Sequence, residues 1–355
     1  MASPVPSPSV WARLVAYFRA RPILVLLLFS PGLIEYLSGS SQLADIVLNP
    51  AFFILQILLN CGLYGPGVLL IREAKLRWNK GWATVLLLGL AYGILEEGIA
   101  LSTMFDPLAA PTVSANLGVY GHFVGVSWVW AVQIDIIHAL LSISVPILLL
   151  DLTLPETRGR SLLIGRQVPW TFLILGVDVT LLILLVWKWV GFWAGLPLIV
   201  GGLAVVGVFI LAGWLAPKDL LVPRSLQPRS PPLSFAFVGF LGFLTFFLSG
   251  TVFRSWALPP ISAIVMELLL GGVVMYWVLQ NVGVQNNERQ LVALIGGLFT
   301  MVMFAGVISQ IELPIVVVAD VAFLLLLRWL WKKYPENLAI VGPTPVPATP
   351  GTNAT

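Results

Sequence analysis

Two adjacent carboxylates lie inside an apolar stretch of the chain. Glu96 and Glu97 belong to the apolar run that begins at Trp82. An ionisable side chain at membrane depth is costly, so such residues are rare and usually mark a functional site. Consecutive residues of a helix point about 100° apart, so one of the two can face a cavity while the other pairs with a neighbouring helix. The pair indicates an intramembrane acid/base or cation-binding site, with a buried polar packing contact as the alternative.

Two glycines define the face of the helix on which Glu97 lies. Gly89, Gly93 and Glu97 follow one another at intervals of four residues, so they share one side of the helix. Small residues at this spacing let a second helix approach closely. We therefore expect Glu97, rather than Glu96, to meet a neighbouring helix and to have the exchangeable role.

A second apolar run offers complementary groups. Asp135, His138 and Ser142 lie on one helical stripe, at i, i+3 and i+7. Three residues in line along one helix cannot converge on a single point as a serine-hydrolase triad does. At 1.5 Å per residue, Glu97 and Asp135 lie about 12 and 15 Å from the outer ends of their runs, so the two helices can share one polar site. Because one imidazolium offsets only one carboxylate, at least one of Glu96, Glu97 and Asp135 should be protonated at neutral pH.

Further carboxylates lie in other apolar runs. Glu35 follows Ser30-Pro31-Gly32, where the proline removes a backbone donor and loosens the helix. Glu267 lies near the middle of a later run, where no Lys or Arg at comparable depth neutralises it. We expect an acidic cavity in the outer half of the membrane, formed by Glu35, Glu96, Glu97, Asp135, His138 and Glu267.

The elements that position these residues are predicted to be membrane-spanning helices. Of the 355 residues, 59% are hydrophobic and only 10% are charged, whereas a soluble domain is about 25% charged. Crossing the hydrocarbon core takes about 20 apolar residues per helix. The sequence therefore predicts an all-α polytopic transmembrane bundle of about ten spans, with nine to eleven possible. The expected spans lie near 23–41, 50–71, 82–105, 124–150, 170–190, 195–216, 234–253, 256–280, 290–311 and 313–331.

The chain divides into three parts on this interpretation. Residues 1–22 form a cytoplasmic segment with an interfacial helix, and residues 23–331 form the transmembrane domain. Within that domain, residues 23–150 carry the polar site, and residues 169–331 are plainer. Residues 332–355 include a proline-rich end and are expected to be a disordered cytoplasmic tail.

The basic residues predict the orientation. Loops that remain in the cytoplasm hold the excess of Lys and Arg. With ten spans and the N-terminus inside, every Lys and Arg except Lys188 and Arg254 falls on the inner side. We therefore expect a multi-pass protein of the cell membrane, of the bacterial cytoplasmic type, with both termini in the cytoplasm.

The spacing of Glu96-Glu97 and His138 resembles that of the CPBP intramembrane proteases, the group of CAAX-prenyl proteases and bacteriocin-immunity proteins. The resemblance implies that Glu96 or Glu97 would be the general base and that His138 would hold water or steady an oxyanion. The chain departs from the family pattern at Leu101, where the family has arginine, and at Ile134, where it has an aromatic residue. No histidine follows His138 to supply the third motif. The chain otherwise looks like uncharacterised bacterial multi-pass proteins.

Three functions fit these residues. Proton- or cation-coupled transport of a small solute is the leading interpretation, because intramembrane carboxylates outnumber bases and lie beside proline-broken helices. An intramembrane endopeptidase that uses Glu and His is the second, and a non-catalytic assembly or immunity factor is the third. Among partners, we expect the lipid bilayer and a small solute or ion, but no nucleic acid. No nucleotide loop, haem motif or zinc spacing is present, so we expect no cofactor and no metal. The substrate and the oligomeric state are not readable from the sequence.

Overall fold

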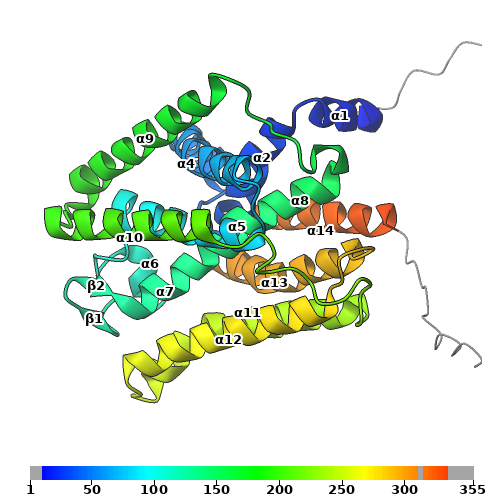
Figure 1. Ribbon diagram of the computed structural model, residues 1–355. Helices are drawn as coiled ribbons and strands as arrows, with labels where there is room; N and C mark the ends of the chain where they lie inside the picture. The colour runs from blue at the N-terminus through cyan, green and yellow to red at the C-terminus, as the bar shows by residue number, and fades with distance from the viewer. Residues whose placement is uncertain (1–9, 311–314, 335–355) are drawn as a thin grey trace, which may run out of the picture.

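The protein is a bundle of α-helices, as expected (Figure 1). The structure is a computed structural model, which describes residues 10–310 and 315–334. The first half contains α1 (Val10–Arg19), α2 (Pro22–Pro31), η1 (Gly32–Tyr36), α3 (Asp45–Leu48), α4 (Pro50–Arg77), α5 (Trp82–Gly93), η2 (Ile94–Ala100), α6 (Ala110–Ser114), β1 (His122–Phe123), β2 (Val126–Ser127), α7 (Trp128–Ile137), η3 (His138–Ser144), α8 (Val145–Thr153) and η4 (Pro155–Thr157). The second half contains α9 (Gln167–Leu185), η5 (Val186–Val190), α10 (Leu196–Leu215), α11 (Pro232–Ser255), α12 (Pro260–Asn281), α13 (Glu288–Ser309) and α14 (Val316–Lys333).

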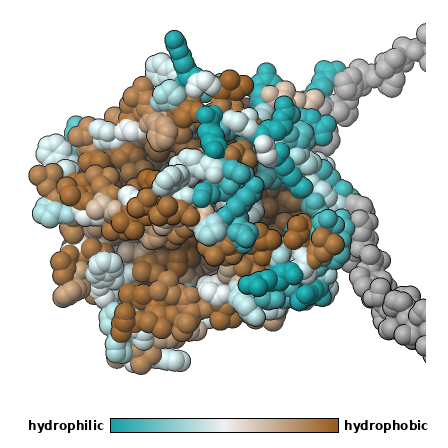
Figure 2. Space-filling view, in the orientation of Figure 1, coloured by the Kyte–Doolittle hydropathy of each residue, from teal (hydrophilic) through white to brown (hydrophobic). Residues whose placement is uncertain are grey.

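Eight of the helices in the described ranges are long and apolar enough to cross a membrane. Figure 2 agrees, because hydrophobic residues cover most of the visible face and hydrophilic ones gather at the end near α1. The first expected span is a shorter apolar helix, Pro22–Tyr36. The last corresponds to α14, and the break expected at Glu312–Pro314 lies outside the described residues. The structure thus supports a membrane-embedded helical bundle, and the count of ten spans stays a prediction.

The helices that carry the expected polar site lie at the centre of the bundle. In the apolar windows of Trp82–Ala100 and Trp128–Thr153, 72% of residues are buried, against 6% in Leu196–Leu215 and 11% in Pro260–Asn281. A helix that is apolar all round can be buried in protein or can face lipid, and its sequence pattern does not separate the two cases. The polar site is therefore enclosed by protein, while α10 and α12 present most of their surface to the surroundings.

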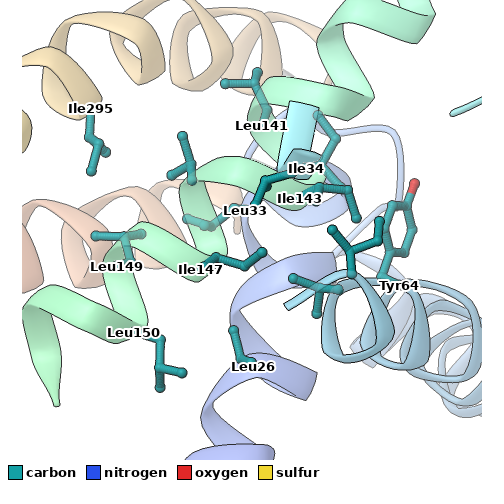
Figure 3. Packing of buried hydrophobic residues seen from close by; sticks show 14 of the residues in the cluster. Leu26, Leu33, Ile34, Tyr64, Leu141, Ile143, Ile147, Leu149, Leu150 and Ile295 are labelled. Atoms are coloured by element: carbon teal, nitrogen blue, oxygen red, sulfur yellow. The ribbon is translucent and has the colours of Figure 1, made fainter. Parts of the chain in front are cut away.

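The main apolar core lies where α2, α4, η3 and α8 meet, and it extends to α13 (Figure 3). Leu26, Leu141, Ile143 and Leu149 are fully buried there. Close packing of such side chains makes this part of the bundle stiff. It holds α4 and η3 in fixed positions on either side of the polar site.

The end of α4 opposite Pro50 is clamped to the loop that follows α8. Glu73 accepts a hydrogen bond from the backbone N–H of Leu162 at 2.6 Å, and Arg72 donates to the carbonyl oxygens of Thr157 and Arg160 at 2.5 and 3.0 Å. Buried charges need such partners. The contacts connect the two helices that flank the site.

The regular α-helix gives way to a π-helical turn in each of three central helices. These turns are η1, η2 and η3. In η2, the N–H of Leu101 bonds to the carbonyl oxygen of Glu96, five residues back. Such turns are rare and occur frequently at functional sites. Glu35, the Glu96-Glu97 pair and His138 all lie on them.

Candidate acid/base site

His138 lies between the two adjacent glutamates. Its Nε2 is 3.0 Å from Oε1 of Glu97, and its Nδ1 is 3.3 Å from Oε2 of Glu96. Nδ1 also lies 2.9 Å from the hydroxyl of Ser142. All four side chains are buried. The imidazole is thus fixed from both nitrogens, which sets its orientation relative to the two carboxylates.

The two glutamates have different surroundings. Glu97 accepts a hydrogen bond from the hydroxyl of Thr103, and Trp130 donates to that same hydroxyl at 3.2 Å. By contrast, neither carboxylate oxygen of Glu96 has a hydrogen-bond partner within the described residues. Glu97 is therefore held by hydrogen bonds, whereas the contact of Glu96 in the described residues is the ion pair of its Oε2 with His138.

The glycine face of α5 brings these groups together as the sequence predicts. A Cβ atom at Gly89 would lie 2.8 Å from Cα of Ala139, and one at Gly93 would collide with Oδ1 of Asp135. Only glycine permits this approach, because any side chain would push α7 and η3 away. The close contact explains how Glu97 reaches His138.

Glu35 joins the site through a tyrosine. It accepts hydrogen bonds from the hydroxyl of Tyr64 at 2.6 Å and from that of Ser41 at 2.8 Å, and Asn60 donates to Ser41. The Tyr64 ring stacks on the imidazole of His138, with 6.1 Å between centroids. In Figure 3 the hydroxyl of Tyr64 points away from the labelled aliphatic side chains. Tyr64 therefore links Glu35 to the central histidine.

A cavity of about 220 Å³ reaches the site from the Pro50 end of α4. Glu35, Tyr64 and Glu96 line its inner part, whereas Glu97 and His138 are not among the lining residues. Phe52 and Trp189, which are 42% and 63% exposed, lie at its outer part. The cavity therefore connects Glu35 and Glu96 with the side of the bundle between α4 and η5.

The remaining predicted site residues divide into two groups. Asp135 is close to the cluster, opposite Gly93, and its Oδ1 has no hydrogen-bond partner within the described residues. Glu267 belongs elsewhere: it is fully buried and accepts from Ser249 at 3.0 Å, between α11 and α12. Glu267 thus lies apart from the cluster around His138, and of the six residues expected to form one cavity only Glu35 and Glu96 line it.

Sequence reasoning missed the uncharged members of the site. Tyr64, Thr103 and Trp130 make specific contacts, but a single buried hydroxyl or indole in an apolar helix leaves no periodic pattern. The Tyr92 hydroxyl is buried without a hydrogen-bond partner in the described part of the chain, and its ring lies 6.4 Å from that of His138. The adjacent Gly93 could have drawn attention to Tyr92.

Glu96, Glu97 and His138 also meet the spacing for metal ligands. One ligand atom from each lies within 4.8 Å of the others. Two hard oxygens and one imidazole nitrogen suit several divalent ions without selecting one. The same geometry serves proton transfer without any metal.

No protein-family model matches the chain, and neither a curated protein nor a solved structure is significantly similar to it.

Proposed function

We propose that this protein is an intramembrane hydrolase, in the simplest case an endopeptidase, with Glu96 as its general base. One observation carries the proposal: Glu96 lines the cavity, neither of its carboxylate oxygens accepts a hydrogen bond within the described residues, and its Oε2 lies 3.3 Å from Nδ1 of His138. A general base must lie within reach of the proton that it removes. The resemblance of Glu96-Glu97 and His138 to the CPBP proteases supports the same assignment.

The reaction follows from these positions. A water molecule between Glu96 and a substrate carbonyl gives a proton to the carboxylate, and its oxygen bonds to the carbonyl carbon. When the carbon–nitrogen bond breaks, the same proton passes from Glu96 to the leaving amine. Glu97 and Ser142 keep the imidazole of His138 in position beside Glu96 throughout. No other reactant is needed.

The developing oxyanion needs a hydrogen-bond donor, and the chain has no arginine at the position where the CPBP pattern has one. Leu101, which stands at that position, contributes an apolar side chain to the cavity. The amides of Gln56 and Asn60 line the same cavity and have N–H groups to donate. We assign them the role of stabilising the oxyanion.

The opening of the cavity suggests the class of substrate. Exposed apolar side chains, Phe52 and Trp189, lie where it meets the side of the bundle. A substrate that arrives there comes from within the membrane or from its surface. A membrane-embedded peptide is therefore the expected substrate.

Coupled transport is the second candidate, and the balance of charge favours it. In the described part of the chain, Glu35, Glu96, Glu97 and Asp135 surround a single imidazole. Such an excess of acid suits a site that binds and releases protons or a cation. In this case the cavity would be one of two alternating access routes.

A cleavage assay separates the two candidates. The protein is reconstituted in vesicles with a mixture of single-span peptides that carry a fluorophore and a quencher, in water enriched in oxygen-18. We expect peptide cleavage with one oxygen-18 atom in each new carboxylate, and a loss of about 10²- to 10⁴-fold in Glu96→Gln, since general base catalysis contributes this much. Glu156→Gln, at a surface ion pair with Arg19, is the control that keeps full activity.

Cleavage that persists in Glu96→Gln would overturn the proposal. Vesicles loaded with a pH-sensitive dye test the alternative in the same preparation. Proton flux in the wild type that Glu97→Gln abolishes, without any cleavage, would support transport instead.

A further inference from the structure

A large groove lies in the half of the protein that the polar site does not use. It has a volume of about 1210 Å³ and runs between α11 and α14, with α13 as its floor. Phe237 and Leu233 of α11, which are 60% and 79% exposed, form one wall. Leu327 and Trp331 of α14 belong to the opposite wall. An exposed apolar surface of this kind marks an interaction site or faces lipid.

Small residues form the floor. Ala293, Gly296, Gly297 and Thr300 of α13 line the groove. Gly297 packs against the backbone of α11, where an added Cβ would contact Ala236. Gly296 faces open space, since an added Cβ would meet only Leu327, at 3.5 Å. The depth of the groove at this point therefore depends on the missing side chain of Gly296.

The length of the groove matches one leaflet of a bilayer. Its lining on α13 runs from Val292 to Thr300, and on α11 from Leu233 to Phe240. At 1.5 Å per residue these segments are about 11 to 12 Å long. One leaflet contributes about 15 Å of hydrocarbon, whereas a transmembrane helix needs about 30 Å. The groove fits the chains of a lipid better than it fits another spanning helix.

Two cations lie at one end of the groove. Arg328 and Lys332 are one helical turn apart on α14, and both are exposed and line the groove. Within the described residues, neither makes an ion pair or a side-chain hydrogen bond. Trp331, between them in the sequence, is of the type that anchors at the membrane interface. The end of the groove thus presents positive charge at the level where lipid headgroups lie.

We infer that this groove binds an anionic phospholipid, with its acyl chains over Gly296 and its phosphate between Arg328 and Lys332. Basic pockets between membrane helices recognise acidic headgroups in this way, and each cation near the surface adds to the attraction. The positive-inside orientation places the site in the cytoplasmic leaflet, where anionic lipids attract such residues. The inference is independent of the chemistry at Glu96.

Native mass spectrometry tests the inference on the full chain released from detergent. Phosphatidylglycerol and phosphatidylcholine with identical acyl chains are the two probes. We expect the wild type to retain phosphatidylglycerol preferentially, and Arg328→Gln/Lys332→Gln to lose the preference by roughly 10- to 30-fold, since two cations near the surface are removed. The matched control is Arg160→Gln/Arg166→Gln, whose exposed side chains lie in a loop away from the groove.

A second pair of variants tests the groove itself. Gly296→Leu fills the floor and should reduce retention of both lipids, while Gly272→Leu on α12, where an added Cβ meets no atom within 4 Å, should not. Unchanged thermal unfolding without lipid shows that both variants fold. A preference for phosphatidylglycerol that survives Arg328→Gln/Lys332→Gln would overturn the inference. So would a wild-type dimer that Gly296→Leu dissociates, because a second copy would then occupy the groove.

Discussion

At the scale of single residues, the carboxylates around the imidazole of His138 differ in the contacts that stabilise them. Glu97 and Glu96 both approach His138, at 3.0 and 3.3 Å, and Glu35 receives two hydroxyl donors. Asp135 has neither arrangement, since its Oδ1 is buried without a hydrogen-bond partner in the described ranges. A buried carboxylate that lacks donors is better neutral than charged. Glu96 also accepts no hydrogen bond in those ranges, but it forms an ion pair with His138, whereas Asp135 forms none there. Among the carboxylates of the cluster, Asp135 is therefore the best place for a proton.

Infrared spectroscopy tests this assignment. We expect a protonated-carboxyl band in the wild type at pH 7 that is absent in Asp135→Asn and persists in Glu97→Gln. The sequence alone favoured Glu97 for the exchangeable role. Geometry points to Asp135 for the resting proton because Glu97 is held by His138 and Thr103.

Glu96→Gln is the control for this measurement, since it neutralises a carboxylate of the same cluster. A band that disappears in Glu97→Gln would restore the assignment made from sequence. The absence of any such band in the wild type between pH 5 and 9 would contradict a shared protonated site.

At the scale of elements, the contact between α5 and the α7–η3 helix determines whether the site forms. Gly89 and Gly93 permit it, as their four-residue spacing predicted. The depths of Glu97 and Asp135 along their helices also predicted that the two helices could share one polar site. The π-helical turns were not predicted, because they depend on tertiary packing around an extra residue rather than on local composition.

A single methyl group should disturb this contact. In Gly93→Ala, the new Cβ would lie 3.2 Å from Cα of Asp135 and from Cβ of His138, besides its collision with the Asp135 carboxylate. We expect a loss of about 1–3 kcal/mol in the free energy of unfolding, as is typical of overpacking. Thermal unfolding in detergent, followed by intrinsic tryptophan fluorescence, measures this change.

Gly98→Ala is the matched control in the neighbouring π-helical turn. Its Cβ would meet its nearest neighbours, Met104 and Phe105, at an ordinary 3.5 Å. It should therefore be neutral, or slightly stabilising through better helix propensity. Equal destabilisation by the two substitutions would mean that the glycine contact has no special role.

At the scale of the whole molecule, hydrophobicity predicted the class of fold. The position of each helix relative to its neighbours in the membrane plane could not be predicted. The depth of a residue along its helix follows from counting residues, so the similar depths of Glu97 and the polar residues around His138 could be predicted. Which helices lie beside each other is not encoded in that count. Glu267 had a suitable depth, yet α12 packs on α11, on the opposite side of the bundle from α4 (Figure 1). The lipid groove was missed for the same reason.

The orientation of the bundle is testable by cysteine labelling, because the chain has only one cysteine of its own to replace. Replacing Cys61 with Ala gives a background for single cysteines at Ser114, before α7, and at Asp219, after α10; both positions are exposed. Because basic loops remain inside, we expect a membrane-impermeant maleimide to label Ser114→Cys in intact cells and Asp219→Cys only after lysis. The reverse pattern would place both termini outside and would move the lipid groove to the outer leaflet.

The π-helical turns make the site vulnerable to a very small genetic change. Each turn accommodates one residue more than a regular helix would in the same height. Deletion of one residue from Ile94–Ala100 would remove that extra residue and return the turn to α-helical geometry, with the flanking segments left in place. Glu96 and Glu97, which lie in the turn, would then meet His138 at other angles, although the span would keep its length and its apolar character almost unchanged. A lineage can therefore lose the chemistry of this protein through a single in-frame codon deletion and still retain an intact membrane bundle.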